Sequence, residues 1–248
     1  MFRVKICGIT SADDALQAAE AGADAIGLNF YEQSPRFVSP DLACEIVAAL
    51  RERHDARQVQ VFAVFVNATL DDIVWTLREG NLFGVEQAVG IQLHGDEPPQ
   101  LLRELRQHGI GTSEDLLHTL GHAPLTPVMR AFRCQSPDLA EVKAYLQACQ
   151  GLTALPQAIL LDSHQPGTYG GTGQPADWQA IGGQRDGLFG LPVVLAGGLT
   201  PRNVAEAIRT ARPDGVDVAS GVESSPGKKD HAQVWAFVAA AKKAFAIS

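Results

Sequence analysis

The sequence predicts a single (β/α)8 barrel, an α/β fold that takes up residues 1–248. Short apolar segments rich in β-branched residues alternate with helical segments about eight times, which is typical of a parallel sheet with helical crossovers. No further domain's worth of sequence is left over, and this favours a closed barrel over an open sheet. The last two strands end in glycine-bearing turns, where barrels of this kind commonly hold a phosphate.

The first half of the chain is predicted to form four strand–helix units. Ser11 with Asp14, and Thr69 with Asp72, have the spacing of a capping box, in which two side chains satisfy the backbone at a helix start. Ser39-Pro40 marks another helix start, because proline fits the first helical position. Strands are expected at residues 3–7, 25–30, 59–66 and 90–93, and helices at 12–22, 40–53, 70–77 and 99–107.

The second half repeats this rhythm after one interruption. The segment from about residue 108 to 127 is too long for a helix-to-strand turn, so we expect an insertion between the fourth helix and the fifth strand, on the amino-terminal face. Ser136-Pro137 is expected to open the next helix, and Thr200 to cap the helix after the seventh strand, with Pro201 in its first position. Strands are expected at 128–132, 158–161, 193–195 and 215–218, and further helices at 176–181, 203–211 and 230–246.

Composition and charge exclude several classes of partner. The net charge is −8 and the basic residues are scattered, which argues against nucleic acid. No charged-then-apolar leader and no long apolar run is visible, so we expect a cytoplasmic protein without a membrane partner. The four cysteines have no metal-binding spacing, and no metal or organic cofactor is expected. The sequence leaves the oligomeric state open between a monomer and a homodimer.

Three glycine-bearing loops are expected at the carboxyl ends of the sixth, seventh and eighth strands. Gly197-Gly198 and Ser220-Gly221 follow two consecutive strands, and bare backbone N–H groups in such turns can surround an anion. The third loop contains Gly171, Thr172 and Gly173 and is placed to fold over a ligand. The plainer interpretation is that the glycines only make tight turns. Two such loops in succession favour a phosphate site.

Two side chains at strand ends could supply a base and an acid. Val4 and Ile6 suit the helix side of the first strand, which leaves Lys5 and Cys7 facing the lumen. An ammonium beside Cys7 is expected to lower the pKa of its thiol from about 8.5. Asp162 ends the sixth strand at the same mouth. The alternatives are a small buried cysteine and an aspartate that caps a turn.

Other polar side chains are expected around this mouth. The second strand contributes Asn29, the fourth contributes Gln92 and His94, and the eighth contributes Asp217 as another candidate carboxyl. Arg36, in the loop after the second strand, could hold a carboxylate with both arms of its guanidinium. Its alternative is a solvated surface arginine.

Taken together, these motifs resemble phosphoribosylanthranilate isomerases, the barrel enzymes of tryptophan biosynthesis. The matching segments fall in order over nearly the whole chain: VKICGIT, GADAIGLNFY with SPR, VFVN, IQLHGDE, LLD, GGTG with DW, LAGGLTPRNV, and GVDVASGVE followed by PGKKD. KICGIT and QLHG are specific to the family, whereas the glycine loops occur in many phosphate-binding barrels. Two features depart from the pattern, namely the insertion at 108–127 and the glycine-rich end of the helix after the sixth strand.

The resemblance implies roles for individual residues. Cys7 would be the general base and Asp162 the general acid, and Arg36 would face the anthranilate carboxylate. His94 and Asp217 would line the site. The phosphate would be held at Gly171-Thr172-Gly173, Gly197-Gly198 and Ser220-Gly221.

The implied reaction is an Amadori rearrangement of a phosphorylated aminosugar, N-(5-phosphoribosyl)anthranilate, to 1-(2-carboxyphenylamino)-1-deoxyribulose 5-phosphate. It needs an acid at the ring oxygen and a base at the neighbouring carbon. A different barrel isomerase or lyase, such as one like indole-glycerol-phosphate synthase, would share the phosphate loops but is expected to use lysine and glutamate. A non-catalytic barrel that binds a phosphosugar is the remaining alternative.

Overall fold

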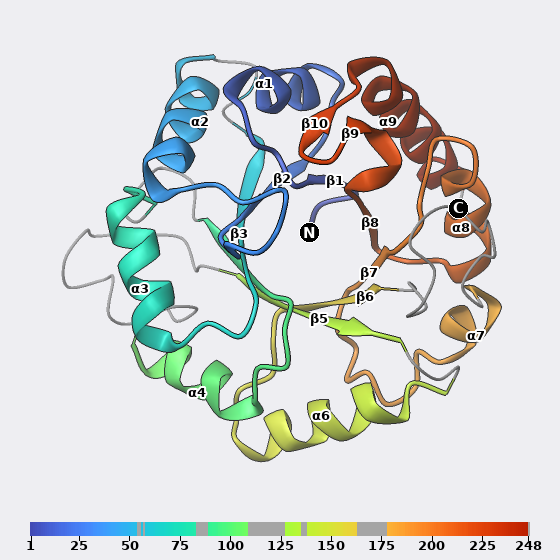
Figure 1. The fold of residues 1–248 in the computed structure, drawn as a ribbon. Coiled ribbons are helices and arrows are strands. Elements are labelled where there is room, and N and C mark those ends of the chain that lie inside the picture. Colours follow the sequence, from blue (N-terminus) through green and yellow to red (C-terminus); the bar gives the residue numbers. More distant parts are fainter. Residues whose placement is uncertain are drawn as a thin grey trace.

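The structure, a computed structural model, describes residues 1–53, 56, 58–82, 89–108, 127–134, 138–162 and 178–247. Eight parallel strands pair in chain order, and the eighth pairs with the first, so the sheet closes into a barrel (Figure 1). The predicted (β/α)8, or TIM, barrel is confirmed. The strands are β1 Val4–Cys7, β2 Ala25–Asn29, β3 Gln60–Phe65, β4 Gly90–Leu93, β5 Val128–Arg133, β6 Ala158–Asp162, β7 Val193–Ala196 and β8 Gly215–Val218.

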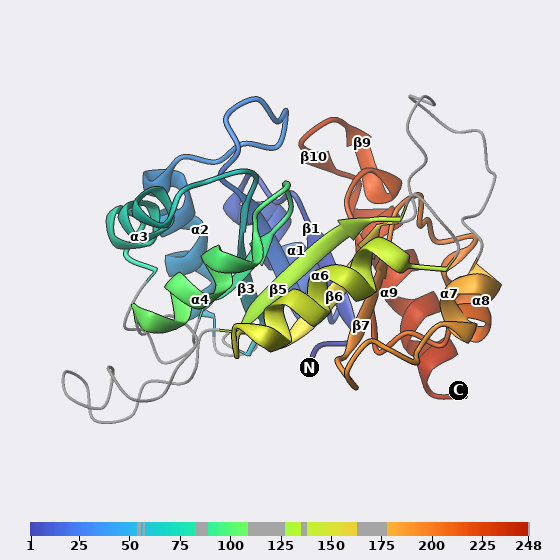
Figure 2. The same ribbon diagram turned by 90° about the horizontal axis from the view of Figure 1, so that it is seen from below.

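The helices surround the strands as an outer ring (Figure 1). The two ends of the barrel are well separated in side view (Figure 2). Both chain termini lie at one end, and a short hairpin of β9 (Glu223–Ser225) and β10 (Lys228–Lys229) lies at the other. No described helix is long and apolar enough to span a membrane. The helices are α1 Ala12–Glu20, α2 Pro40–Glu52, α3 Leu70–Glu79, α4 Pro99–Gln107, α6 Ala140–Gly151, α7 Trp178–Gly183, α8 Val204–Ala211 and α9 His231–Phe245.

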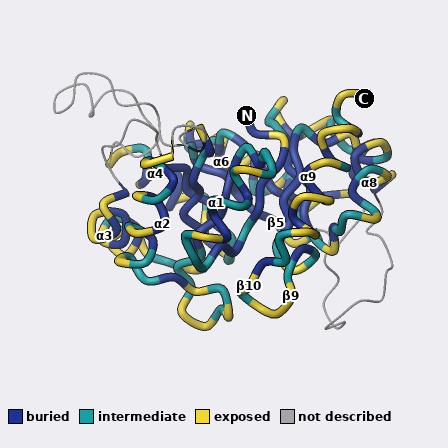
Figure 3. The backbone as a smooth tube through the Cα atoms, turned by 90° about the horizontal axis from the view of Figure 1, so that it is seen from above, coloured by how far each residue is buried: buried dark blue, intermediate teal, exposed yellow. Residues whose placement is uncertain are grey.

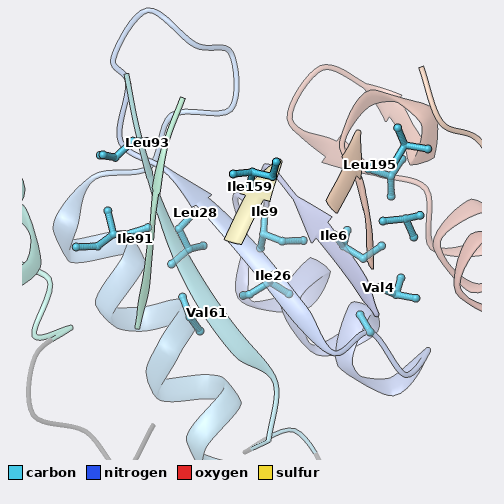
Figure 4. Close-up of a cluster of buried hydrophobic side chains, with 14 of the residues drawn as sticks. Val4, Ile6, Ile9, Ile26, Leu28, Val61, Ile91, Leu93, Ile159 and Leu195 are labelled. Carbon is cyan, nitrogen blue, oxygen red and sulfur yellow. The ribbon is translucent and has the colours of Figure 1, made fainter. Parts of the chain in front are cut away.

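The core consists of two apolar layers. The larger one lies between the strands and the helices, and the side chains in Figure 4 belong to it, including Ile6 and Ile26. The smaller one fills the lumen, with Phe62 and Leu160 among its members. Side chains alternate between these layers, as expected for a barrel. In Figure 3 the buried strands accordingly lie inside helices whose outer faces are exposed.

The predicted helix caps are confirmed in part. The Thr69–Asp72 capping box forms completely, with both reciprocal hydrogen bonds present. At α1 the Ser11 hydroxyl accepts from the backbone N–H of Asp14. The second half of that box is not made. The Asp14 carboxylate accepts instead from the backbone N–H of Lys229, at 3.3 Å, and lies 2.9 Å from His231 Nε2.

Two predicted helix starts are wrong. Helix α8 begins at Val204 with Asn203 at its N-cap, because residues 200–203 form a separate turn. In that turn Asn203 Oδ1 accepts from the backbone N–H of Thr200 at 2.7 Å, so Pro201 precedes the helix. Helix α6 begins at Ala140, later than the predicted start, and its N-cap is Leu139 in the left-handed region. Ser136 and Pro137 themselves lie outside the described residues.

Two further predictions, and one element that was not predicted, concern the segments between the barrel strands and helices. Helix α4 ends at Gln107 and β5 begins at Val128, so the predicted insertion enters and leaves at the amino-terminal end of the barrel. Residues 109–126 lie outside the described residues. So does the loop with Gly171, Thr172 and Gly173. The hairpin of β9 (Glu223–Ser225) and β10 (Lys228–Lys229) was not predicted, because its strands are short and polar.

Candidate active site

The carboxyl ends of the strands surround a cavity of about 360 Å³. Every predicted site residue that the structure describes lines this cavity, except Gln92, which is buried beneath His94. The cavity therefore collects side chains from strands and loops that are far apart in the sequence. The predicted site residues that line it are Cys7, Asn29, Arg36, His94, Asp162, Gly197, Gly198, Asp217, Ser220 and Gly221.

A buried ion pair supports the base of the cavity. Nζ of Lys5 lies 2.9 Å from Oδ1 of Asp217, and the Lys5 side chain is fully buried. The two residues are partners in the β1–β8 ladder, so their side chains start from adjacent points of the sheet. Burial by itself would lower the pKa of Lys5, but the attraction of Asp217 and Cys7 outweighs it and the pKa is raised. The lysine is thus held as an ammonium.

Cys7 lies two residues beyond Lys5 and shares its side of the strand. Both side chains lie against Gly27: a Cβ there would be 2.6 Å from Cys7 Sγ and 3.0 Å from Lys5 Nζ. Burial raises the pKa of the thiol, Lys5 opposes the rise, and Asp217 adds to it. The prediction that Lys5 lowers the pKa of Cys7 is therefore wrong in its net direction. Lys5 lies beside Cys7 as expected, but its ammonium is paired with Asp217, and burial disfavours the charged thiolate.

Asp162 and His94 face each other across the cavity mouth. Nε2 of His94 is 3.7 Å from Oδ2 of Asp162, and both side chains are partly exposed. On its other side the His94 ring meets Gln92, whose Nε2 is 2.7 Å from Nδ1. Which of the two atoms donates depends on the tautomer of the ring, and Nε2 is the ring nitrogen that faces Asp162. Gln92 is fully buried, and its Oε1 has no hydrogen-bond partner in the described chain.

The loop that carries His94 rests on a buried support that sequence reasoning missed. Glu97 is 2% exposed, and its carboxylate accepts from the backbone N–H groups of Gly95 and Asn67. Arg130, from β5, lies 3.4 Å from the same carboxylate and donates to the carbonyl oxygen of Gly95. These contacts join the loops after β3 and β4. Glu97 does belong to the IQLHGDE motif, which was the available signal.

Arg36 has a partner that the sequence did not predict. Its Nε and one terminal nitrogen donate to the two oxygens of Glu223, at 2.8 and 2.6 Å. Asn29 shapes the loop that carries the arginine, because Asn29 Nδ2 donates to Ser34 Oγ, which in turn accepts from the backbone N–H of Arg36. Asn29 therefore has a structural task at the rim of the cavity. The other terminal nitrogen of Arg36 has no partner among the described residues.

Glycine is required geometrically in two turns of the cavity wall. Gly197 and Gly198 have φ angles of 87° and 63°, in the left-handed region that side chains disfavour. A Cβ on Gly221 would overlap the carbonyl oxygen of Leu199, so the turns after β7 and β8 touch through their backbones. Backbone groups from two neighbouring turns thus form this wall together with Ser220.

Within the part of the chain that the structure describes, one cluster of potential metal-ligand side chains lies away from the cavity. Single ligand atoms of Asp13, Asp14 and His231 fall within 4.8 Å of one another. Asp14 already accepts from the backbone N–H of Lys229. The cluster joins the amino-terminal ends of α1 and α9, where carboxylates are favoured by the helix dipole.

Comparison with known proteins decides what kind of barrel this is. Residues 4–121 and 123–240 match the family of N-(5'-phosphoribosyl)anthranilate (PRA) isomerases. A protein of this name from Myxococcus xanthus is 44% identical over 97% of this chain and 96% of its own length. Another from Geobacter sp. (strain M21) is 40% identical over 98% of this chain and 99% of its own. The chain belongs to this family.

As a phosphoribosylanthranilate isomerase, the protein is an enzyme of tryptophan biosynthesis. The isomerase of Thermotoga maritima superposes with a TM-score of 0.76 at 36% identity, covering 98% of this chain and 100% of that one. A phosphoribosylanthranilate isomerase in complex with reduced 1-(o-carboxyphenylamino)-1-deoxyribulose 5-phosphate superposes with a TM-score of 0.73 at 34% identity, with the same coverage. The family assignment favours the predicted isomerase over a lyase or a non-catalytic barrel.

Proposed function

We propose that this isomerase converts N-(5-phosphoribosyl)anthranilate with Cys7 as general base and Asp162 as general acid. The observation that carries the proposal is that the thiol and the carboxyl line the same cavity as Arg36 and the two glycine turns. A base, an acid, a cation for a carboxylate and backbone donors for a phosphate are therefore within reach of one small molecule. No other step of the rearrangement requires a further group.

The first step opens the ribose ring. Protonated Asp162 gives its proton to the ring oxygen while the C1–O bond breaks, and the lone pair of the substrate nitrogen forms the C=N bond. In the second step the thiolate of Cys7 removes the proton from C2. The electrons of that C–H bond form the C1=C2 double bond, while the π electrons of the C=N bond return to nitrogen, which gives an enolamine. The thiol of Cys7 then returns its proton to C1, and the carboxylate of Asp162 takes the proton of the C2 hydroxyl. These two transfers give the ketone and restore both groups.

The ends of the substrate are held away from the reacting atoms. Backbone groups of the Gly197-Gly198 and Ser220-Gly221 turns would take the phosphate, together with Gly171, Thr172 and Gly173, and so use binding energy to orient C1 and C2. The terminal nitrogen of Arg36 that Glu223 leaves free would receive the anthranilate carboxylate. The ligand of the related isomerase, with a carboxyphenyl group and a phosphate, supports this division.

The experiment is a turnover assay with phosphoribosylanthranilate, which loses its fluorescence on conversion. Asp162→Asn keeps the shape of the side chain but cannot donate a carboxyl proton, so its rate is expected to fall by roughly 10²–10⁴. Asp214→Asn is the matched control, because Asp214 forms an ion pair with Arg185 just before β8, at the opposite end of the barrel. Loss of activity in both variants, or in neither, would count against the role of Asp162.

A further inference from the structure

The unpredicted hairpin of β9 and β10 lies beside the cavity and places two charged side chains in the protein interior. It stands above the barrel at the carboxyl end of the strands (Figure 2). Lys229 pairs with Glu223 across the hairpin, and both side chains are almost fully buried, at 0% and 4% exposure. Buried charges are costly unless each has a close partner. Their contacts therefore indicate what the hairpin does.

Glu223 receives three hydrogen bonds, and both of its oxygens are used. Arg36 donates to the two oxygens at 2.8 and 2.6 Å, and Lys229 Nζ donates to Oε1 at 2.8 Å. Burial by itself would raise the pKa of Glu223, but these hydrogen bonds outweigh it and the pKa is lowered. One carboxylate therefore lies between two cations, and one positive charge of the three groups remains for a ligand.

This contact fixes the orientation of Arg36 before any ligand arrives. A guanidinium has five N–H donors, and Glu223 occupies the edge formed by Nε and one terminal nitrogen. The remaining edge is formed by the two terminal nitrogens, each of which has an N–H group directed along it, so this edge can bind the two oxygens of a second carboxylate. Gly8 allows the close approach of the arginine stem, because a Cβ there would overlap Cδ of Arg36. A side chain held at one edge loses less entropy when the other edge binds.

Lys229 extends the same network to the phosphate turn. Its Nζ also donates, at 3.2 Å, to the carbonyl oxygen of Ala219, which directly precedes Ser220. Burial is the largest influence on Lys229 and lowers its pKa, even though the hydrogen bond to Glu223 favours the charged form. The hairpin is further attached at Gly227, whose carbonyl oxygen accepts from Thr10 Oγ1. It thus touches the loops after β1, β2 and β8.

We infer that Glu223 is a positioning residue that holds Arg36 for the substrate carboxylate, and that Lys229 fixes this arginine relative to the phosphate turn. The inference rests on the proposed function, because it assumes that Arg36 and the Ser220-Gly221 turn bind the two ends of the substrate. Neither residue of the hairpin touches the substrate in this account. Their effect passes through Arg36 and through the carbonyl group of Ala219.

Two probe ligands distinguish effects on binding of the substrate's carboxylate end from effects on binding of its phosphate end. One is reduced 1-(o-carboxyphenylamino)-1-deoxyribulose 5-phosphate, and the other is the same molecule without the carboxyl group. The dissociation constant of each probe is measured for wild type and for Glu223→Gln. In this variant an NH2 group replaces one of the two carboxylate oxygens that accept hydrogen bonds from Arg36 and Lys229. The carboxylated probe is expected to bind about tenfold or more weakly, as for a displaced binding group, and the other within about twofold of wild type.

Further variants distinguish geometry from charge. Glu223→Asp keeps the negative charge but is one methylene too short for the two bonds to Arg36, so it is expected to resemble Glu223→Gln. Lys229→Met keeps the length of the side chain but donates no hydrogen bond, so it is expected to weaken both probes. Asp214→Asn, with its ion pair at the opposite end of the barrel, is expected to change neither constant.

Each other outcome has a definite meaning. Equal weakening of both probes in Glu223→Gln, or binding of the carboxylated probe as tight as in wild type, would overturn the inference. If Glu223→Gln does not fold by circular dichroism, the same comparison in Glu223→Asp decides. Arg36→Ala tests the underlying function: if it binds both probes like wild type, Arg36 is not the carboxylate partner. If Arg36→Ala weakens only the carboxylated probe and the Glu223 variants do not, the inference alone is wrong.

Discussion

Nζ of Lys5 lies 2.9 Å from Oδ1 of Asp217, and this pair is buried directly below the thiol of Cys7. The ammonium is therefore not available to Cys7 alone. Burial raises the pKa of the thiol. Lys5 lowers this pKa, but the negative charge of Asp217 raises it and so offsets part of the effect of Lys5. The raised pKa means that the thiol of Cys7 is expected to be mostly protonated at neutral pH, and its thiolate, once formed, to be strongly basic.

The first prediction concerns the titration of Cys7. Thiolate reacts with iodoacetamide and thiol does not, so the alkylation rate of Cys7 is expected to rise with pH. Because burial raises the thiol pKa above 9.0, the midpoint of this rise is expected above that pH. Mass spectrometry of the Cys7 peptide measures the rate at each pH. A rate that is already constant at neutral pH would contradict the raised pKa.

The second prediction concerns the buried pair. Lys5→Met leaves Asp217 buried without its cation, which is expected to cost about 3–5 kcal/mol of unfolding free energy. Lys5→Met combined with Asp217→Asn removes both charges and is expected to recover a large part of that loss. Urea denaturation of the two single variants and the double variant measures the coupling. Additive losses would mean that the two side chains do not interact.

Much of this site follows from the sequence, because the alternation of side chains along a strand and the residue at which a strand ends are local properties. Alternation along β1 places Lys5 and Cys7 in the lumen, and the end of β6 places Asp162 at the mouth. The pairing of Arg36 with Glu223 could not be predicted in the same way. The two residues are 187 positions apart, and only closure of the barrel brings their loops together.

The predicted direction of the pKa shift of Cys7 is wrong for a related reason. The sequence shows that a lysine is near the cysteine, but not how deeply the thiol is buried or that Asp217 already holds the ammonium. Thr200 followed by Pro201 predicts a helix start, because threonine suits the N-cap and proline the first helical position. Asn203 competes successfully, since its side chain closes a turn with the Thr200 backbone before α8 begins.

The third prediction compares substitutions in the two glycine turns, after β7 and after β8. Gly198 has a φ of 63° and open space where a Cβ would lie, so Gly198→Ala is expected to cost about 1–3 kcal/mol of backbone strain without a clash. Gly221→Ala must displace the carbonyl group of Leu199, and both turns with it. Its KM for the substrate is expected to rise more than that of Gly198→Ala. Steady-state kinetics and thermal unfolding check both, and an unchanged KM in both variants would remove the phosphate assignment.

The fourth prediction uses the carboxylate of Glu223. Its pKa in the folded protein lies below the ordinary value of 4.5, so its contribution to stability is fully present above that pH and is lost as the pH falls through the folded pKa. Wild type is therefore expected to be more stable than Glu223→Gln at neutral pH, with the difference shrinking as the pH drops below 4.5. Thermal unfolding across this range measures it. A difference that is independent of pH would show that the ionised carboxylate is not what stabilises the hairpin.

The most direct test of the central claim, that Cys7 is the catalytic base, is the turnover number of Cys7→Ser with phosphoribosylanthranilate. Serine keeps the size and place of the side chain but is a far weaker base, so kcat is expected to fall by a factor on the order of 10²–10⁴. Binding of the reduced product analogue is expected to stay close to wild type, since the thiol is needed for proton removal and not for holding either end. A kcat within a few-fold of wild type, with the analogue still bound, would contradict the assignment and leave Cys7 as a packing residue.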